Sequence, residues 1–465
     1  MKNYRLIRFA LLISILTIVS CDFSNSQRDG WDKLDEIRKN IIPPTFQDKD
    51  FNIVDFGAVA DGKTDCTEAF RKAISACNEA GGGRVVVPEG EFFTGAIHLK
   101  SIVNLYLSKN SVIKFSTNPQ DYLPLVFTRW EGVECMNYSP LIYAYEQENI
   151  AVTGSGIIDG QGANDNWWPW KGNKVDGWIE GTPHQKKGRD LLFQMAEDNV
   201  HPQERIMGEG FYLRPSFFQP YKSKNILVDG VTFKNSPMWF LNPVLCENVT
   251  VKNLKIEGLG PNNDGCNPES SKNVLIQNCY FDTGDDCIAI KSGRNNDGRR
   301  INVPSENIII EDCNMKEGHG GVVMGSEISG GVRNVFAQNC EMSSPNLDRA
   351  LRFKTNAVRG GTIENIYFRN IKVGEVSEAV IKIDYYYEEG KKGNFLPTIR
   401  NVHVQNLTSE KSKFAIWIKA FDNAPVTGLY LDNCNFNQVA KDNVIEHVKD
   451  YKFNSVMINN KIISE

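Results

Sequence analysis

One short phrase recurs through the second half of this 465-residue chain. It reads NILVDGVTF at residue 225 and returns as NVTVKNLKI at 248, NVLIQNCYF at 273, NIIIEDCNM at 307, NVFAQNCEM at 334, NIYFRNIKV at 365, NVHVQNLTS at 401 and GLYLDNCNF at 428. The starts lie 23 to 36 residues apart. Repeats of this length are typical of stacked units, because a single unit cannot bury its own apolar face.

Within the phrase, apolar and polar positions alternate, which predicts a strand with one buried face. The sixth position is Asn, Asp or Gly, and these residues tolerate a left-handed backbone and bend the chain. The seventh position turns inward again and holds Val, Leu, Ile or Cys. Because cysteine shares this position with larger apolar residues, we predict buried thiols rather than disulfides at Cys279, Cys313, Cys340 and Cys434. The disulfide state of Cys66, Cys77, Cys135, Cys246, Cys266 and Cys287 stays open.

A second strand phrase follows most units. It reads CIAIKS at 287, GVVMGS at 321, ALRFKT at 350, VIKIDY at 380 and AIWIKA at 415. Several strands per unit without helical periodicity between them predict an all-β fold, a right-handed, single-stranded parallel β-helix. A β-sandwich or a propeller fits less well, because the units vary in length while the strand phrases do not.

Upstream of the repeat, residues 67–77 have helical spacing, and we expect a short helix that caps the open end of the coil. The first coils follow at 81–92, 104–115 and 149–160. The repeat then lapses between about 160 and 220, which predicts a loop insertion in a catalytic domain spanning 49–465. The insertion carries Trp167, Trp168, Trp170 and Trp178. These could stack on sugars or simply pack the loop, and the sequence leaves both open.

The N-terminus reads as a targeting segment. Basic residues precede a short apolar run that ends at Ser20, which predicts a signal peptide over residues 1–20. The following Cys21 completes a stretch that resembles the bacterial lipobox. The resemblance implies an exported protein with a lipid on Cys21, a tether over 21–48 and anchoring in the bacterial cell envelope. An ordinary secretory signal with an incidental cysteine is the alternative.

Charge limits the possible partners. The net charge is −5, the pI is about 5.8 and there is no basic run, so nucleic acid is not expected as a partner. Membrane contact is expected only through the lipid anchor, and we expect a monomer.

The stretch TGDDCIAIKSG at 283–293 places Asp285 and Asp286 side by side before a strand phrase, where Gly284 is expected to permit a kink. His319 precedes the next strand phrase, and Arg352 and Lys354 lie in the one after it. Residues in equal phase on successive coils stack at about 4.8 Å, so these side chains should form one outward-facing cluster.

Asp264, one unit earlier, adds a third carboxylate to this cluster. Clustered carboxylates repel one another, so the pKa of one of them should rise. A protonated carboxyl beside an ionised one is the acid and base pair of glycoside hydrolysis. The two cations of ALRFKT suit a negatively charged sugar.

The series NND, GDD, GHG and RFK, in this order, resembles the polygalacturonase family of glycoside hydrolases (glycoside hydrolase family 28), whose usual pattern is NTD, GDD or QDD, GHG and RIK. The likeness extends from about residue 50 to the 430s. Asn263 and Phe353 depart from the family pattern without removing a functional group, and they leave the choice of substrate within the pectin class less certain.

The resemblance implies an inverting hydrolase of the α-1,4-linked galacturonan of pectic polysaccharide or oligogalacturonides, with no metal and no cofactor. It makes Asp285 the general acid. It implies that Asp264 and Asp286 hold and activate the water, and that His319 tunes or reprotonates the acid. Arg352 and Lys354 would bind the substrate carboxylate, and Tyr385 would shape the same subsite. Inversion predicts carboxyl groups roughly 6.5–9.5 Å apart.

TRWEGVE at 128–134, with the long insertion after it, resembles bacterial family members that cut from chain ends, which favours exo-action. Hydrolysis of rhamnogalacturonan or xylogalacturonan is an alternative on the same scaffold. A glycan-binding β-helix without catalysis would be expected to lack one of the aspartates. A pectate lyase would lack the GDD, GHG and RxK series and often needs calcium.

Overall fold

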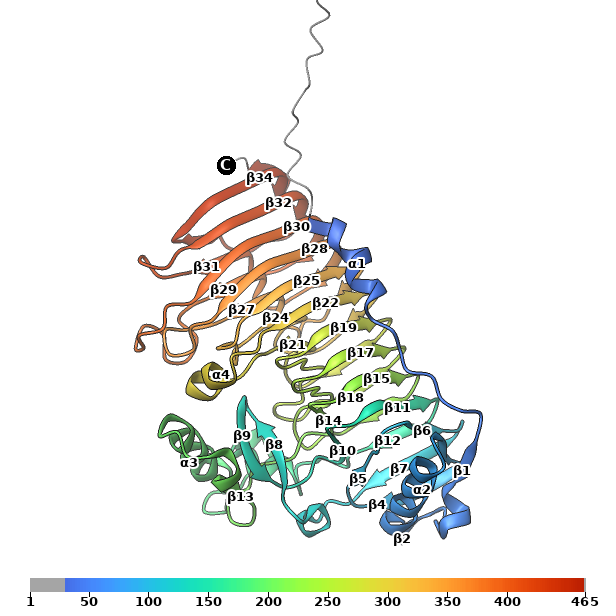
Figure 1. Ribbon diagram of the computed structural model, residues 1–465. Coiled ribbons are helices and arrows are strands. Elements are labelled where there is room, and N and C mark those ends of the chain that lie inside the picture. The colour runs from blue at the N-terminus through green and yellow to red at the C-terminus, as the bar shows by residue number, and fades with distance from the viewer. Residues whose placement is uncertain (1–29, 464–465) are drawn as a thin grey trace, which may run out of the picture.

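The computed structural model describes residues 30–463 and shows parallel sheets wound around one apolar core (Figure 1). Successive turns of the chain add strands to the same sheets, so the colour in Figure 1 changes in order from blue at one end of the stack to red at the other. The prediction of a right-handed, single-stranded parallel β-helix is confirmed. The connections keep the handedness that parallel crossovers favour.

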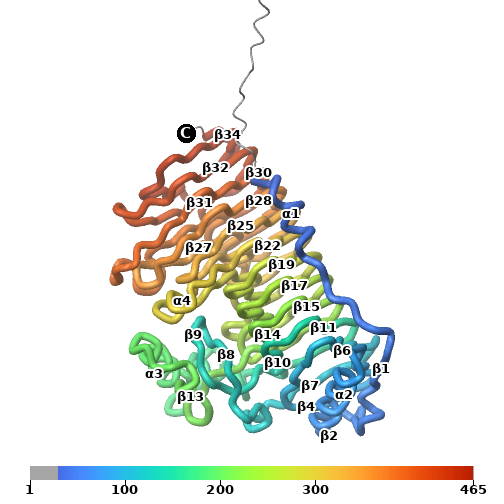
Figure 2. The backbone as a smooth tube through the Cα atoms, in the orientation of Figure 1, coloured from blue at the N-terminus to red at the C-terminus, as the bar shows by residue number. Residues whose placement is uncertain are grey.

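Three columns of parallel strands run along the molecule, and Figure 2 shows them as stacked turns. The first column contains β1 (Asp50–Asn52), β3 (Gly83–Val87), β6 (Val103–Leu107), β11 (Glu148–Gly154), β15 (Lys224–Asp229), β17 (Glu247–Lys252), β19 (Lys272–Gln277), β22 (Ser305–Glu311), β25 (Val332–Gln338), β28 (Thr362–Glu375), β30 (Thr398–Lys411), β32 (Val426–Phe436) and β34 (Val448–Ile458). The second contains β2 (Asp61–Asp65), β4 (Gly90–Thr94), β7 (Ser111–Phe115), β12 (Ile157–Asp159), β16 (Thr232–Lys234), β18 (Lys255–Gly258), β20 (Tyr280–Thr283), β23 (Asn314–Met315) and β26 (Glu341–Met342), and it merges with the first at β28.

The third column carries the second strand phrase. It consists of β5 (Ile97–His98), β10 (Ile142–Tyr145), β14 (Phe218–Tyr221), β21 (Ile288–Ile290), β24 (Val322–Met324), β27 (Arg349–Lys354), β29 (Ala379–Asp384), β31 (Phe414–Lys419) and β33 (Val444–Glu446). Single bridges through Leu241 and Cys266 connect β14 to β21, so the column is continuous.

Register explains how the repeat makes a core. Ile308, Val335 and Ile366, all at the second position of the phrase, are direct partners on β22, β25 and β28. They are fully buried, as are the other inward positions of the phrase. The four seventh-position cysteines are also buried, and all ten cysteines of the described residues are free thiols. The prediction that these thiols act as small apolar residues is confirmed.

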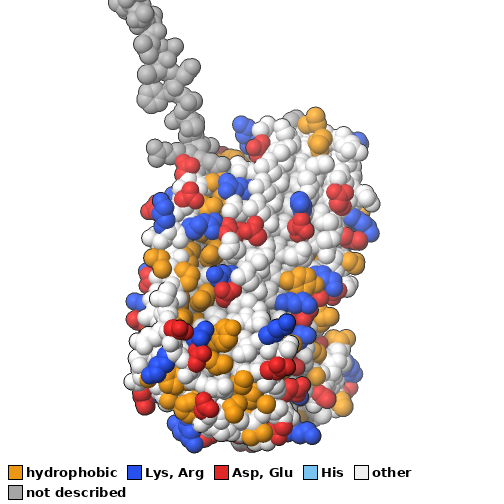
Figure 3. Space-filling model, turned by 90° about the vertical axis from the view of Figure 1, so that its right-hand side faces the viewer, with side chains coloured by type: hydrophobic (Ala, Val, Ile, Leu, Met, Phe, Trp, Pro, Cys, Tyr) orange, Lys and Arg blue, Asp and Glu red, His pale blue; other side chains and the backbone are white. Residues whose placement is uncertain are grey.

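Asparagine ladders run along the bends. Eight asparagines at the start of the phrase or its equivalent have φ of 55° to 58°, and from Asn225 onward each side-chain amide donates to the side-chain oxygen of the asparagine one coil earlier. They are Asn149, Asn225, Asn248, Asn273, Asn307, Asn334, Asn365 and Asn401. The sixth-position residues also take positive φ, as predicted, and form a second, exposed ladder. Figure 3 shows a band with few charged or hydrophobic side chains along the long axis of one face.

Both ends of the stack are covered. α2 (Thr67–Glu79) packs Phe70, Ile74 and Cys77 onto the first coils, so the predicted capping helix is confirmed. At the other end, β35 (Lys461–Ile463) pairs antiparallel with β34. Antiparallel pairing interrupts the growth of the parallel sheet, which would otherwise leave an exposed edge.

Residues 30–41 lie against the outside of the first column, and the structure differs there from the expected tether. η1 (Gly30–Lys33) and α1 (Leu34–Lys39) bury Trp31, Leu34 and Ile37 against the outward side chains of β22, β25 and β28. Both guanidinium nitrogens Nη1 and Nη2 of Arg38 donate to Glu311, at 2.6 and 2.7 Å. An amphipathic pattern within this largely polar segment explains the docking. We call residues 30–41 the strap.

The predicted signal peptide 1–20 and the lipidated Cys21 lie outside the described residues. Within residues 30–463, no helix combines the length and the apolar character needed to cross a bilayer.

Residues 160–217, between β12 and β14, leave the coil and form a small side structure. It contains η4 (Trp168–Lys171), η5 (Lys174–Asp176), α3 (Lys186–Glu197), η6 (Pro202–Glu204) and β13 (Ile206–Met207). The hairpin β8 (Val126–Trp130) and β9 (Val133–Asn137) joins it through β13, and a separate apolar core holds it together. We call residues 126–137 and 160–217 the side wall. It lies next to α4 (Asn295–Ile301) in Figure 2. The remaining 3₁₀ helices are η2 (Ile53–Phe56) and η3 (Pro119–Tyr122).

The first ladder should contribute to stability through both its hydrogen bonds and its backbone conformation. Asn307 donates to Asn273 and accepts from Asn334, at 3.1 and 3.0 Å. N307A removes both bonds and places a Cβ-bearing residue without a local hydrogen bond at φ 57°. We expect a loss of about 2 kcal/mol, measured as a lower thermal unfolding midpoint.

N307G separates the two contributions, because glycine tolerates positive φ but makes no side-chain hydrogen bond. It should be less destabilised than N307A. Equal stability of N307A and the wild type would contradict a stabilising ladder.

Candidate active site

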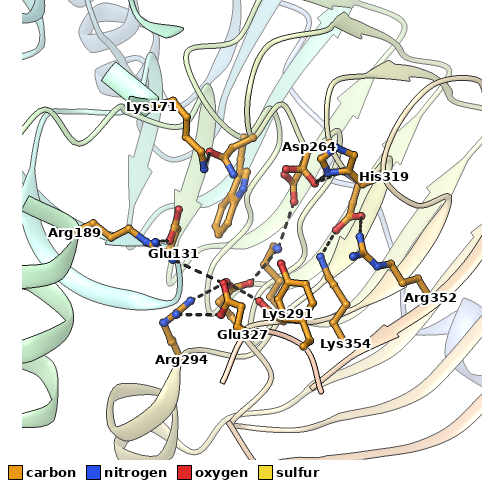
Figure 4. Close-up of a pocket in the computed structure, with 17 residues that line it drawn as sticks. Glu131, Lys171, Arg189, Asp264, Lys291, Arg294, His319, Glu327, Arg352 and Lys354 are labelled. Atoms are coloured by element: carbon orange, nitrogen blue, oxygen red, sulfur yellow. Dashed lines mark hydrogen bonds and ion pairs between the residues drawn. The ribbon is translucent and has the colours of Figure 1, made fainter. Parts of the chain in front are cut away.

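A pocket of about 210 Å³ opens beside the third column, where it meets the side wall (Figure 4). Seventeen residues line it, and most are charged. In Figure 4, Glu131, Lys171 and Arg189 of the side wall lie across the pocket from Arg352 and Lys354 of the later coils.

Stacking of the coils brings the predicted residues together. Asp264 follows β18, Asp285 and Asp286 follow β20, and His319 follows β23, so all four lie in equivalent loops between the second and third columns. These loops lead into Cys266, β21 and β24, which are paired in parallel register. The phase inferred from the sequence therefore holds in the structure.

Gly284 has a different role from the one expected. Its φ is not positive, but a Cβ at this position would lie 2.2 Å from the carbonyl oxygen of Gly260 on the preceding coil. The glycine therefore permits close approach of two coils. It is needed where the Asp264 loop and the Asp285 loop meet.

Asp286 is buried between two cations. Arg352 Nη1 donates to its Oδ1 at 3.2 Å, and Lys354 Nζ donates to its Oδ2 at 2.6 Å. Both cations also lie near the ring of Tyr387, at 5.7 and 5.4 Å from its centroid. Such pairing stabilises a carboxylate that burial has desolvated.

Asp285 pairs with His319, whose Nδ1 lies 3.0 Å from Asp285 Oδ1. The same oxygen accepts from the backbone N–H of Asp286 at 2.9 Å. Burial acts to raise the pKa of Asp285, but the hydrogen bond and charge of His319 outweigh it and hold this pKa well below its usual range. That hydrogen bond also raises the pKa of His319 to about 9. At neutral pH the pair is an imidazolium and a carboxylate.

Asp264 is the carboxyl that keeps a proton. Burial raises its pKa to about 8, Lys291 opposes this effect, and the charges of Asp285 and Asp286 add to it. Its Oδ2 accepts from Asn267 Nδ2 at 3.1 Å and lies 3.4 Å from Lys291 Nζ. The sequence predicts a raised pKa within the cluster, and the family resemblance implies a proton on Asp285, the acid, whereas the pKa values place the proton on Asp264.

One oxygen from each of the three aspartates lies within 4.8 Å of the others. This distance joins the nearest oxygens, one from each group, and it is shorter than the roughly 6.5–9.5 Å expected between whole carboxyl groups on opposite sides of a bond. The reason is the fold, because Asp285 and Asp286 are neighbours and Asp264 is one coil away, at about the interstrand distance. Three such oxygens could converge on a cation, but Arg352 and Lys354 already neutralise Asp286, and Lys291 lies beside Asp264.

A second charged group lines the floor of the pocket. Lys291 Nζ lies 3.1 Å from Glu327 and 4.5 Å from the centre of the Trp239 ring. Arg294 Nη1 lies 3.5 Å from Glu327. Lys291 and Arg294 hold the pKa of the buried Glu327 well below its usual range, against the effect of burial.

The side wall supplies the remaining charges. Glu131, in the turn of the β8–β9 hairpin, accepts from Arg189 Nε at 2.9 Å. Lys171 at the end of η4 donates to Asn262 Oδ1 at 2.8 Å. The hairpin is tied to the coil by the ion pair of Arg129 and Glu269, 3.3 Å apart and both fully buried.

Tyr385 does not face the pocket, and its predicted role in substrate binding is wrong. It is fully buried in the core, and its hydroxyl accepts from the backbone N–H of Ile399 at 3.1 Å. Alternation explains the error, because Tyr385 is in phase with the inward Ile381 and Ile383 of β29. The tyrosine that lines the pocket is Tyr387, beyond the end of the strand.

The tryptophans of the insertion pack the loop. Trp167 is buried in the main core, Trp168 and Trp170 pack against it, and the indole of Trp168 donates to the carbonyl of Ser236 at 2.9 Å. The indole of Trp178 donates to Thr182, within the insertion. The aromatic residue that faces the pocket from this side is Trp239.

The two departures from the family pattern are both structural. Asn263 is fully buried, and its amide donates to the carbonyls of Ser236 and Met238, so it holds the Asp264 loop. Phe353 points into the core and packs on Phe368.

Several pocket residues were missed or given no role. Lys291 occupies the same place in CIAIKS as Lys354 does in ALRFKT, so alignment of the second phrase could have found it. The repeat carries no signal for five of them, which lie outside the repeated strand phrases: Glu131, Lys171, Arg189, Glu388 and Tyr387. TRWEGVE was noticed in the sequence, and it supplies Glu131.

Comparison with known proteins gives consistent results. The sequence model described as Glycosyl hydrolases family 28 matches residues 209–457, and one described as Rhamnogalacturonase A/epimerase, pectate lyase-like matches residues 51–121. An exo-poly-alpha-D-galacturonosidase of Dickeya chrysanthemi is 28% identical over 88% of this chain and 73% of its own length. The crystal structure of a hyperthermoactive exopolygalacturonase from Thermotoga maritima is 46% identical with a TM-score of 0.90, over 93% of this chain and 97% of that one. A Yersinia enterocolitica family 28 exopolygalacturonase, 24% identical with a TM-score of 0.73 over 90% and 77%, shares the fold.

The proton on Asp264 makes stability depend on pH. Because the pKa is about 8 in the folded protein and about 4 in an unfolded chain, the folded state binds an extra proton between these values. Its stabilising contribution is complete below about pH 4 and is lost as the pH rises through about 8. In D264N this loss is absent, so the melting temperature should fall less between about pH 5 and pH 8 than in the wild type.

D312N is the matched control, since it exchanges the same groups at an exposed ladder position where the other coils carry asparagine or glycine. It should follow the wild-type pH profile. Parallel profiles for D264N and the wild type would refute the raised pKa.

Proposed function

The chain belongs to glycosyl hydrolase family 28, and we propose on this premise that it is an exo-acting polygalacturonase, which hydrolyses α-1,4-galacturonosyl linkages from a chain end of pectin. One observation carries the proposal: three carboxylates and His319 lie in a pocket between a cationic coil surface and the side wall. Relatives from Dickeya chrysanthemi and Thermotoga maritima that are described as exo-acting support it.

The side wall supports cutting from an end. An enzyme that cuts within a polymer needs a groove open on both sides, whereas here Glu131, Lys171 and Arg189 bound the pocket on one side. Buried ion pairs fix this wall to the coils, at Arg129 with Glu269 and at Arg205 with Asp297. A rigid wall would stop the chain after its terminal unit, so the unit beside it would be the one released.

Asp285 acts as the general acid in this proposal. Asp264 and Asp285 are close enough for their titrations to depend on each other, so the proton on Asp264 belongs to the pair. The reactive arrangement has this proton on Asp285 and leaves Asp264 ionised. As the bond between the anomeric carbon and the glycosidic oxygen breaks, Asp285 gives its proton to that oxygen. His319, 3.0 Å away and protonated, can restore it.

Asp264 and Asp286 hold the water. A water oxygen bonds to the anomeric carbon from the face opposite the leaving group, and its proton passes to one of these carboxylates. Arg352 and Lys354 orient Asp286 and remain close enough to bind a substrate carboxylate. Displacement from the opposite face inverts the anomeric centre, so the first product is the β anomer.

Neither a pectate lyase nor a glycan-binding protein without catalysis is favoured, because the pocket contains the three aspartates, the histidine and the cations expected of a hydrolase. A binding protein would not need the proton arrangement of Asp264, Asp285 and His319. Rhamnogalacturonan or xylogalacturonan remains distinguishable by assay, because the products differ.

Polygalacturonate digestion tests the proposal. With the wild type we expect galacturonate monomer from the first time points, as the β anomer by proton NMR, and no product with the near-ultraviolet absorbance of an unsaturated sugar. D285N should reduce the rate by about 10³-fold, since it removes the acid.

D282N is the matched control, because Asp282 lies three residues before Asp285 and pairs with Lys316 at the surface. It should keep the wild-type rate. An early ladder of oligomers would exclude exo-action, and no release from polygalacturonate would exclude the substrate.

We further propose that the protein is exported and lipid-anchored through Cys21. The support is the sequence before residue 22, which resembles a lipobox. In a bacterial host, C21S should move the protein from the membrane fraction to the soluble fraction, because lipid chains provide the membrane affinity. Retention of C21S in the membrane would contradict the anchor.

A further inference from the structure

We infer that Lys171 binds the carboxylate of the terminal galacturonosyl unit, the one that the enzyme releases, and so selects for an acidic, unesterified sugar at the chain end. The inference rests on the proposed exo-polygalacturonase function. It adds a second carboxylate site, opposite Arg352 and Lys354.

The charges of the pocket leave Lys171 without an acidic partner. Every other lysine or arginine that lines it has a carboxylate within ion-pair distance. These cations are Arg189, Lys291, Arg294, Arg352 and Lys354. For Lys171, no carboxylate of residues 30–463 lies within that distance, and its ammonium donates instead to the neutral Asn262. Two of its three protons are therefore available to a ligand.

Nearby groups strengthen the case for an anion. Asn262 Oδ1 also accepts from Arg214 Nη2 at 2.7 Å, and Arg214 is fully buried without an ion pair in the described chain. Two cations thus converge on one amide oxygen. Burial is also the main cause of a lowered pKa for Lys171. A bound carboxylate would restore the stability of the charged amine.

Lys171 is held where the terminal sugar should lie. η4 is fixed below it by the buried Trp167 and by the hydrogen bond of Trp168 to Ser236. Lys171, Asn262, Asp285 and His319 line both the main pocket and an adjoining groove of about 250 Å³. The ammonium of Lys171 therefore lies, like the proposed acid Asp285, where the pocket meets the groove, and it belongs to the side wall proposed to stop the chain.

This placement predicts chemical selection rather than general affinity. A methyl ester removes the charge of a carboxylate and adds a group that the ammonium cannot solvate. A charge-assisted hydrogen bond in a partly buried site should then discriminate by about 10²-fold between acid and ester. If Lys171 bound ring hydroxyl groups instead, acid and ester would be affected alike.

The test compares kcat/KM for two trigalacturonates, one with all carboxyl groups free and one methyl-esterified only on the unit that is released. The wild type should prefer the acid by about 10²-fold. K171M should lose about that factor on the acid and little on the ester, so the preference largely disappears. K171R should recover part of the preference because it keeps the charge.

K174M is the matched control, since Lys174 is an exposed lysine of the same insertion that pairs with Glu180. It should keep both rates. Wild-type discrimination in K171M, or an equal loss on both substrates with an unchanged melting temperature, would overturn the inference. If the wild type releases nothing from the free-acid substrate, the proposed function fails first, and this inference fails with it.

Discussion

Parallel stacking of strands at a fixed spacing is the constraint on which the rest of the structure depends. Each coil adds apolar residues to the same inward columns and asparagines to the same bends. An asparagine in a left-handed conformation satisfies two needs at once, the bend itself and a hydrogen bond to the next coil. Because every turn repeats this solution, residues distant in the sequence reach neighbouring positions by translation along one axis.

The same translation produces the active site, because charged residues occupy equivalent loops of successive coils there. Asp264, Asp285 and His319 occupy equivalent loops of three successive coils. Most of the charges that this brings together are compensated, as in the contact of Asp286 with Arg352 and Lys354. The exceptions matter for chemistry. Asp264 retains a proton because burial and its acidic neighbours disfavour its charged form, and Lys171 retains a charge that no acid of the described chain compensates.

The fold and the centre of the site were predictable from the sequence because both obey the repeat. The second and seventh positions face the core, and the phase of Asp285, His319 and Arg352 was read from the same pattern. For Tyr385, the alternation of the strand was a better guide than the family resemblance, because alternation with Ile383 already predicts an inward side chain. Lys291 was equally visible in the second strand phrase.

Elsewhere the sequence had no periodicity to read. Lys171, Arg189 and Tyr387 lie outside the repeated strand phrases, and their direction depends on packing against other parts of the chain. The side wall is an example, because it is positioned by buried pairs such as Arg205 with Asp297, which join residues 92 positions apart. Such contacts depend on the three-dimensional arrangement of the chain, and no local sequence pattern predicts them.

The strap covers part of the outer face of the coil. It crosses the outer surface of β22, β25 and β28, where Figure 1 shows α1, and the catalytic pocket opens beside the third column. The strap and the mouth of the pocket therefore lie on different flanks of the molecule. Contacts made along the strap would therefore leave the mouth of the pocket unobstructed.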